Sequence, residues 1–170
     1  MDFANPDIIR HIVDSCRTIA VVGLSWNASR PAHWVAVYLQ QHGYTIIPIN
    51  PNEPTVLGDR AYATLSDAPR KIDLVSVFRR SAEAGAVINQ TIEIGPRAIR
   101  LQEGVIDEGA ARRAYESGLL VVMDRCWLKE HRRPTSQFVD DDLRLKRQIN
   151  FCSPINSVLK RGAVLVSTPD

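Results

Sequence analysis

The sequence is poor in cysteine and has no large excess of charge of either sign. Its three cysteines stand far apart, at Cys16, Cys126 and Cys152, without a Cys-x-x-Cys pair, which argues against a disulfide framework and a zinc knuckle. The four histidines lack a His-Glu-x-x-His spacing, so we expect no metal site. The formal net charge is only +2. A nucleic-acid-binding protein usually needs a far more basic surface, so we expect no nucleic-acid partner.

Long apolar runs and targeting signals are also missing. No run approaches the roughly 18 residues of a membrane span. Residues 1–6 lack the basic start and apolar stretch of a signal peptide. We therefore expect a cytoplasmic protein with no membrane partner. With 170 residues, 45% of them hydrophobic, the chain can form one globular core.

Short apolar runs alternate with stretches of helical periodicity. The runs are continuous and rich in β-branched residues, as in strands buried on both faces of a parallel sheet, and they occupy residues 19–22, 45–47, 74–78, 98–101 and 119–123. Apolar residues three and four apart predict helices between the runs, with Trp34 on the first apolar stripe. Gly43 and Gly118 follow two of these stretches, where helices commonly end. The pattern predicts an α/β fold, a Rossmann-like doubly wound three-layer sandwich with a mainly parallel sheet of about five strands.

We expect two regions along the chain. Residues 1–133 form the Rossmann-like domain, including an N-terminal helix that packs Ile8, Ile9, Ile12 and Val13 against the sheet. Residues 134–170 form a C-terminal extension of unknown role. Its apolar run at 163–166 is compatible with an edge strand or with a contact to a second subunit in a homo-oligomer, and the sequence favours neither.

The loop after the first strand is the first candidate for a ligand site. In open parallel sheets, ligands bind beyond the carboxyl ends of the strands where the strand order reverses, normally beside the first strand. This loop begins with Gly23, offers the hydroxyls of Ser25 and Ser29, and leads into a helix N-terminus that favours phosphate. Arg30 would supply a full positive charge. Neither the G-x-G-x-x-G dinucleotide pattern nor the P-loop pattern is present.

Two further loops extend the predicted site. The second strand ends at Asn50 and Pro51, where an NAD-binding domain would carry an acidic residue, so we expect the Asn50 amide to bind a sugar or base edge. The third strand ends at Phe78, Arg79 and Arg80, just before another helix. We expect one of these arginines to contact the ligand and the other to reach solvent, while Phe78 is equally compatible with core packing and base stacking. With Arg30, three guanidiniums fit a ligand with several phosphates.

Taken together, these segments resemble the single-domain CoA-binding proteins, whose Rossmann-like domain is similar to that of the succinyl-CoA synthetase alpha subunit. The resemblance spans roughly residues 15 to 133 and rests on the motifs IAVVGLS at 19–25, Arg30-Pro31, VYL at 37–39, Gly43-Tyr44, IPINP at 47–51, Leu57-Gly58, VSVFRRS at 75–81, LQEGV at 101–105 and VVMDRC at 121–126. Each motif alone is weak, but their shared order along the chain is specific.

The resemblance implies where each part of coenzyme A would lie. The pyrophosphate would lie over residues 23–30, the adenosine near Asn50, Pro51 and Phe78, and the pantetheine toward residues 102–104. The complete predicted binding set is Gly23, Leu24, Ser25, Ser29, Arg30, Asn50, Pro51, Phe78, Arg79, Arg80, Ser81, Gln102 and Gly104. The synthetase transfers acyl groups with a phosphohistidine on a second domain and with a partner subunit, and this chain is too short for either. No catalytic residue is therefore assigned.

Two functions remain open at this point. The favoured one is binding of coenzyme A or an acyl-CoA by a cytosolic, non-catalytic carrier or regulatory module. The alternative is a small NAD(P)- or acyl-CoA-dependent enzyme, a reductase or acyl transferase, that uses Cys126 or Asp124. Arg125 lies beside Cys126 and favours a reactive thiolate, whereas free cysteines are often simply buried.

Overall fold

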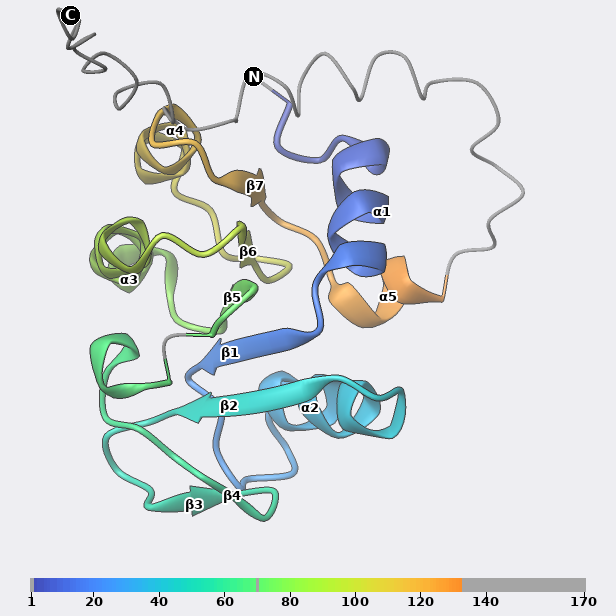
Figure 1. The fold of residues 1–170 in the computed structure, drawn as a ribbon, viewed down its shortest axis with the longest axis vertical. Helices are drawn as coiled ribbons and strands as arrows, with labels where there is room; N and C mark the ends of the chain where they lie inside the picture. The colour runs from blue at the N-terminus through green and yellow to red at the C-terminus, as the bar shows by residue number, and fades with distance from the viewer. Residues whose placement is uncertain (1, 70, 133–170) are drawn as a thin grey trace, which may run out of the picture.

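The computed structural model describes residues 2–69 and 71–132, and these residues form a three-layer α/β fold (Figure 1). The central sheet has five strands, β1 (Thr18–Val22), β2 (Thr45–Ile49), β5 (Leu74–Val77), β6 (Ala98–Leu101) and β7 (Leu120–Val122). They are all parallel, in the order β2-β1-β5-β6-β7. This confirms the predicted Rossmann-like class, and the order reverses between β1 and β5, beside the first strand.

Helices cover both faces of the sheet. One face carries α1 (Pro6–Ser15), α2 (Pro31–Gln41) and the short α5 (Trp127–His131), and the other carries a 3-10 helix (Leu65–Asp67), α3 (Ser81–Ile94) and α4 (Glu108–Glu116). Successive residues of a strand point to opposite faces of the sheet. Ile19 and Val21 therefore pack toward the first face, and Ala20 and Val22 toward the second. Both faces are therefore buried, as continuous apolar strands require.

The N-terminal helix forms as expected. Asn5 caps α1 by accepting a hydrogen bond from the Asp7 backbone N–H, and Pro6 occupies the first turn. The helix buries Ile8, Ile9, Ile12 and Val13. Two predicted helix ends also hold, since Gly43 and Gly118 follow α2 and α4 with φ of 81° and 91°.

Three features differ from the sequence expectation. Trp34 is 60% exposed, because α2 turns Ala32, Val35, Ala36 and Leu39 toward the sheet instead. A small hairpin of β3 (Thr55–Val56) and β4 (Asp59–Arg60) follows β2. Helix α5 begins at Trp127, beyond the last predicted strand at 119–123, and it buries that side chain almost completely.

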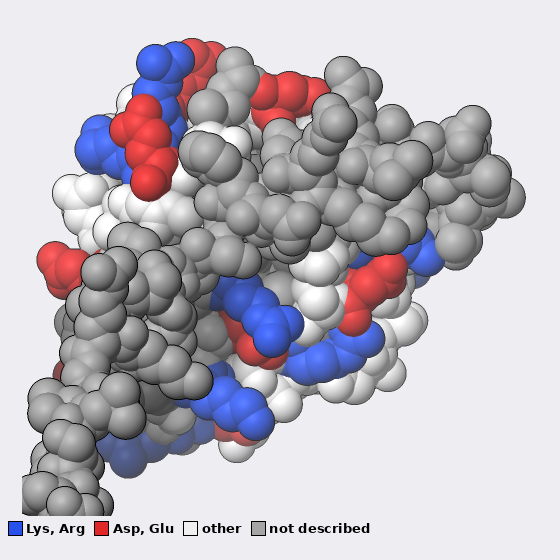
Figure 2. Space-filling view, turned by 45° about the horizontal axis from the view of Figure 1, so that its top comes forward, with Lys and Arg blue, Asp and Glu red and all other residues white. Residues whose placement is uncertain are grey.

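The surface mixes charges of both signs. On the face drawn in Figure 2, lysine and arginine side chains lie close to aspartate and glutamate side chains rather than forming one broad basic area. In the described part of the chain, no helix has the length and apolar character needed to cross a bilayer. The predicted C-terminal extension, residues 134–170, lies outside the described residues, as does the homo-oligomer contact predicted for it.

Candidate functional site

The predicted site residues lie on loops at the carboxyl ends of the strands, which we call the carboxyl edge. The loop after β1 meets the loop after β5 at Gly23, where a Cβ would stand 2.6 Å from the Phe78 carbonyl oxygen and 3.4 Å from Arg79 Nε. Gly23 also has φ of +90°, a conformation that side chains rarely tolerate. The structure therefore brings Gly23 and Arg79 together. The close Phe78 carbonyl oxygen explains why position 23 is a glycine.

The rest of the first loop combines buried and exposed groups. Leu24 is fully buried, backbone included, so the structure exposes no part of it at the loop surface. Ser25 is 9% exposed, and its Oγ has no hydrogen-bond partner among residues 2–69 and 71–132. The Ser29 hydroxyl donates to Asn27 Oδ1 at 2.7 Å. Arg30 is exposed at the start of α2, and no ion pair engages it within the described residues.

The Asn50 side chain links the loop after β1 to the loop after β2 by hydrogen bonds. Its Nδ2 donates to the Leu24 carbonyl oxygen at 2.9 Å, and its Oδ1 accepts from the Asn52 backbone N–H at 3.0 Å. Both ends of the amide thus already have protein partners, and Pro51 beside it is exposed. The contact predicted between the Asn50 amide and a sugar or base stays a prediction, and this geometry leaves Pro51 as the freer surface.

The two arginines after β5 take different positions. Arg79 is half-buried against Gly23, whereas the Arg80 side chain is 87% exposed and pairs with Glu83 at 3.1 Å. Arg79 thus crosses the loop after β1 while Arg80 reaches solvent, and the contact predicted between one of them and a ligand stays a prediction. Ser81 accepts a hydrogen bond from the Ile106 backbone N–H at 3.0 Å, which ties the start of α3 to the loop after β6.

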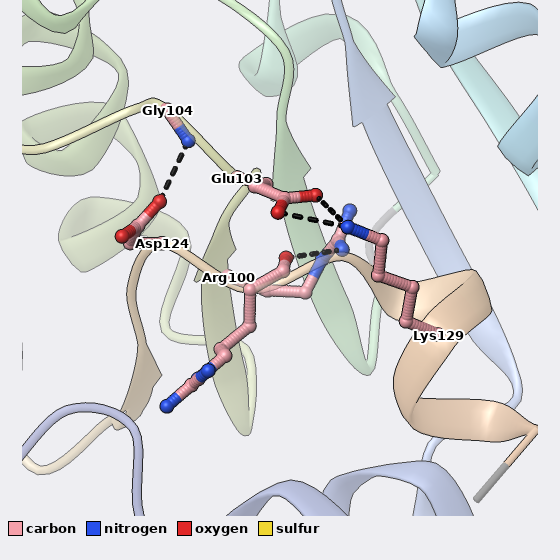
Figure 3. Close-up of polar contacts among 6 residues, drawn as sticks. Arg100, Glu103, Gly104, Asp124 and Lys129 are labelled. Carbon is pink, nitrogen blue, oxygen red and sulfur yellow. Dashed lines mark hydrogen bonds and ion pairs between the residues drawn. The ribbon is translucent and has the colours of Figure 1, made fainter.

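The loop after β6 holds the remaining predicted residues. Gln102 is 8% exposed, and its Oε1 finds no partner in the described part of the molecule. Gly104 has φ of +84° and donates its backbone N–H to Asp124 Oδ1 at 2.7 Å. Lys129 pairs with Glu103 at 2.7 Å. As Figure 3 shows, these two contacts fasten the loop to the segment after β7 and to α5.

The sequence reasoning missed Arg100, a buried cation below the carboxyl edge. It is 1% exposed, donates to Ser76 Oγ at 2.7 Å and to the Arg125 carbonyl oxygen at 3.0 Å, and lies over the rings of Phe78 and Trp127. Burial lowers the pKa of its guanidinium to about 10, so it stays charged at neutral pH. The one available signal was an arginine inside an otherwise apolar strand. Phe78 is accordingly half-buried, with Arg100 over its ring.

Comparison with known proteins identifies the family. A model of the CoA binding domain matches residues 17–132, which include all five strands of the main sheet and every loop of the carboxyl edge. The chain belongs to the CoA-binding domain family. The expected resemblance is thereby confirmed, with nearly the boundaries that the motifs indicated.

Relatives of this CoA-binding domain span small and large proteins. The uncharacterized protein YneT of Bacillus subtilis is 37% identical over 118 residues, 69% of this chain and 87% of YneT. The solved structure of Prb, the PH1109 protein redesigned for binding, has a TM-score of 0.75 and 35% identity, covering 82% of this chain and 99% of that one. An ADP-forming acetate–CoA ligase of Archaeoglobus fulgidus is 25% identical over 62% of this chain but only 16% of the ligase.

Proposed function

We propose that this protein binds coenzyme A or an acyl-CoA at the carboxyl edge. We further propose that it acts in the cytoplasm as a non-catalytic carrier or regulatory module. The observation that carries the proposal is the CoA-binding family match over residues 17–132. That match coincides with a sheet whose strand order reverses between β1 and β5, where ligands of open α/β sheets bind.

Unpartnered polar atoms support this placement. Ser25 Oγ and Gln102 Oε1 lie on loops either side of the β5 loop, and both are buried without a partner in the described residues. Buried polar groups in native proteins nearly always have a hydrogen-bond partner. A bound ligand with phosphate and amide groups would supply partners to both atoms.

Positive charge is available for the phosphates. Arg79 lies over Gly23, and Arg30 stands exposed at the first turn of α2. Helices α2 and α3, of 11 and 14 residues, both begin at this edge and direct their free backbone N–H groups toward it. The local cations explain how a protein of net charge +2 would bind a ligand with several phosphates.

The size of the matching region supports a binding module. The aligned region, 62% of this chain, corresponds to 16% of the Archaeoglobus fulgidus ligase, so the similarity covers one part of that enzyme and carries none of its activity to this chain. Asp124, which the enzymatic alternative uses, already accepts a backbone hydrogen bond from Gly104. We therefore assign binding, and no catalytic step, to this site.

Calorimetric titration with coenzyme A, dephospho-coenzyme A, NAD and ATP tests the proposal. We expect coenzyme A to bind most tightly. Hydrogen bonds to charged groups are worth roughly 1.5 to 3 kcal/mol, so removing the 3′-phosphate should weaken binding about ten- to a hundredfold. Absence of coenzyme A binding, or tighter binding of NAD, would refute the assignment. Equal affinities for coenzyme A and dephospho-coenzyme A would show that none of these arginines contacts the 3′-phosphate.

A second assay separates binding from catalysis. The protein is incubated with acetyl-CoA, and mass spectrometry follows both the thioester and the intact chain. We expect the thioester to survive as it does in buffer and the chain to carry no acetyl group. Turnover of the thioester, or an acetyl group on Cys126, would favour the enzymatic alternative.

A further inference from the structure

Cys126 lies next to the part of the carboxyl edge assigned to pantetheine. It stands directly before α5, and its side chain is half-buried. Its neighbour Arg125 is fixed to β6 through both backbone groups: the N–H donates to the Leu101 carbonyl oxygen at 3.5 Å, and the carbonyl oxygen accepts from Arg100. The turn carrying Cys126 is therefore held against the end of the strand that leads into Gln102.

Gln102 points toward the same layer as Cys126. Along β6, Ala98 and Arg100 face α1 and α5, whereas Ile99 and Leu101 face α3 and α4. The Gln102 backbone N–H continues the ladder by donating to the Val77 carbonyl oxygen at 3.1 Å, so the alternation places Gln102 on the α5 side. Its buried Oε1, without a partner in the described chain, lacks a donor there, and the amide N–H groups of pantetheine are donors of the right kind.

A buried positive charge lies beside the turn that carries Cys126. The guanidinium of Arg100 donates to the carbonyl oxygen of Arg125 and lies over the ring of Trp127, the two residues that flank Cys126, and its own Nε has no hydrogen-bond partner in the described part of the chain. Reactive cysteines in proteins typically lie in partly exposed, electropositive surroundings of this kind. Cys16 has a different environment: it is fully buried, and burial raises the pKa of its thiol.

We propose that Cys126 is a thiol–disulfide exchange site that forms a mixed disulfide with coenzyme A. The inference rests on the proposed function, since the bound nucleotide is what brings the pantetheine sulfur to this thiol. The reactant is a disulfide of coenzyme A, such as the symmetric dimer.

The exchange balances without another oxidant or reductant. The Cys126 thiol gives up its proton, and its sulfur attacks the sulfur of the bound coenzyme A half. A new sulfur–sulfur bond forms between Cys126 and that half, and the original bond breaks. The other half leaves as a thiolate, takes up one proton and departs as free coenzyme A. Cys126 is thereby oxidised to a disulfide while the leaving half is reduced to a thiol.

The test treats the reduced full-length chain with coenzyme A disulfide, pantethine or oxidised glutathione at equal low concentration. Intact-mass spectrometry follows each reaction, and peptide mapping locates the adduct. We expect one coenzyme A, less two hydrogen atoms, on Cys126. Binding raises the local concentration of the reacting sulfur, so coenzyme A disulfide should react at least about tenfold faster than pantethine, which has the same reactive end without the nucleotide. Excess acetyl-CoA should slow the reaction by occupying the site.

Variants and calorimetry make each outcome decisive. Cys152→Ser, the matched control, should keep the adduct, whereas Cys126→Ser should lose it while unfolding at the same temperature as the unmodified chain. Equal rates for all three disulfides, or an adduct on Cys16 or Cys152, would overturn the exchange site. If coenzyme A binds in calorimetry but Cys126 stays unmodified, the proposed function survives and this inference fails. If coenzyme A does not bind, the proposed function fails first.

Discussion

The Nε atom of Arg79 lies 3.4 Å from the point where a Cβ on Gly23 would stand, so the arginine side chain extends across the glycine at the reversal of strand order. This contact joins the phosphate loop predicted after β1 to the arginines predicted after β5. The Phe78 carbonyl oxygen, 2.6 Å from the same point, leaves no room for a side chain at Gly23.

Gly23→Ala should destabilise the fold more than Gly118→Ala does. Both glycines have φ near +90°, which alone costs about 1 kcal/mol for alanine. Only Gly23 has an atom within 4 Å of the added Cβ, so Gly118→Ala measures the backbone cost by itself. Urea denaturation of both variants checks the expectation. Equal losses of unfolding free energy would mean that the Phe78 carbonyl oxygen moves aside freely.

Arg79→Ala should weaken coenzyme A binding far more than Arg80→Ala. Arg79 is half-buried against Gly23, whereas Arg80 is largely exposed and engaged with Glu83. Loss of one hydrogen-bonded charge on a phosphate corresponds to about a ten- to hundredfold change in affinity. Calorimetric titration of the two variants gives the comparison directly. The reverse ranking would place the ligand on the solvent side of α3.

Arg30→Ala should weaken coenzyme A binding and leave the melting temperature of the free protein nearly unchanged. Arg30 is exposed and makes no ion pair with the residues that the structure describes. Arg112→Ala, a change at an exposed position of α4, is the matched control and should leave affinity unaltered. A large fall in melting temperature without ligand would reveal a structural arginine at position 30.

Stability should rise with pH through the range in which His131 titrates. This ring packs among Tyr38, Tyr44 and His42, and its Nδ1 lies 2.9 Å from the Tyr38 hydroxyl oxygen. Burial lowers the pKa of His131 below 6.5. The nearby positive groups His42, Arg17 and Arg10 lower this pKa further, and Asp14 opposes them. The unfolded chain then binds the proton more readily, so the stabilising contribution is complete above about pH 6.5 and declines as the pH falls through the folded-state pKa.

Urea denaturation between pH 5 and 8 measures this dependence. His131→Asn should flatten the slope, whereas His11→Asn, at a half-buried position of α1 that makes no ring contact with His131, should preserve it. An unchanged slope in His131→Asn would assign the pH dependence to another group.

Arg100→Leu should destabilise the domain by about 1 to 3 kcal/mol, because it leaves Ser76 Oγ and the Arg125 carbonyl oxygen without a hydrogen-bond donor. Chemical denaturation gives the magnitude. Unchanged stability would mean that apolar packing at this position compensates fully for the lost hydrogen bonds.

Local patterns sufficed for most of the fold, and long-range contacts explain what they missed. The strands and α1 follow from periodicity and capping within short windows. The exposure of Trp34 could not be read in the same way, because the small residues Ala32 and Ala36 define the buried stripe of α2. Arg100 is buried because α5 covers it with Trp127, and α5 itself was not predicted.

The candidate site could likewise be predicted only in part. Topology rules placed Gly23, Ser25 and Arg79 on one edge of the sheet, and the resemblance to CoA-binding proteins added Gln102; the structure has all four at that edge. The rules could not show that the Asn50 amide is occupied by Leu24 and Asn52, since that depends on contacts between two loops.

Nuclear magnetic resonance titration with coenzyme A tests the central claim most directly, because it locates the ligand residue by residue. We predict that the largest backbone amide shifts occur at Gly23, Ser25, Arg79 and Gln102, on the carboxyl edge. Shifts concentrated at Gly43, Gly95 and Gly118, which end the helices at the opposite edge of the sheet, would contradict the account.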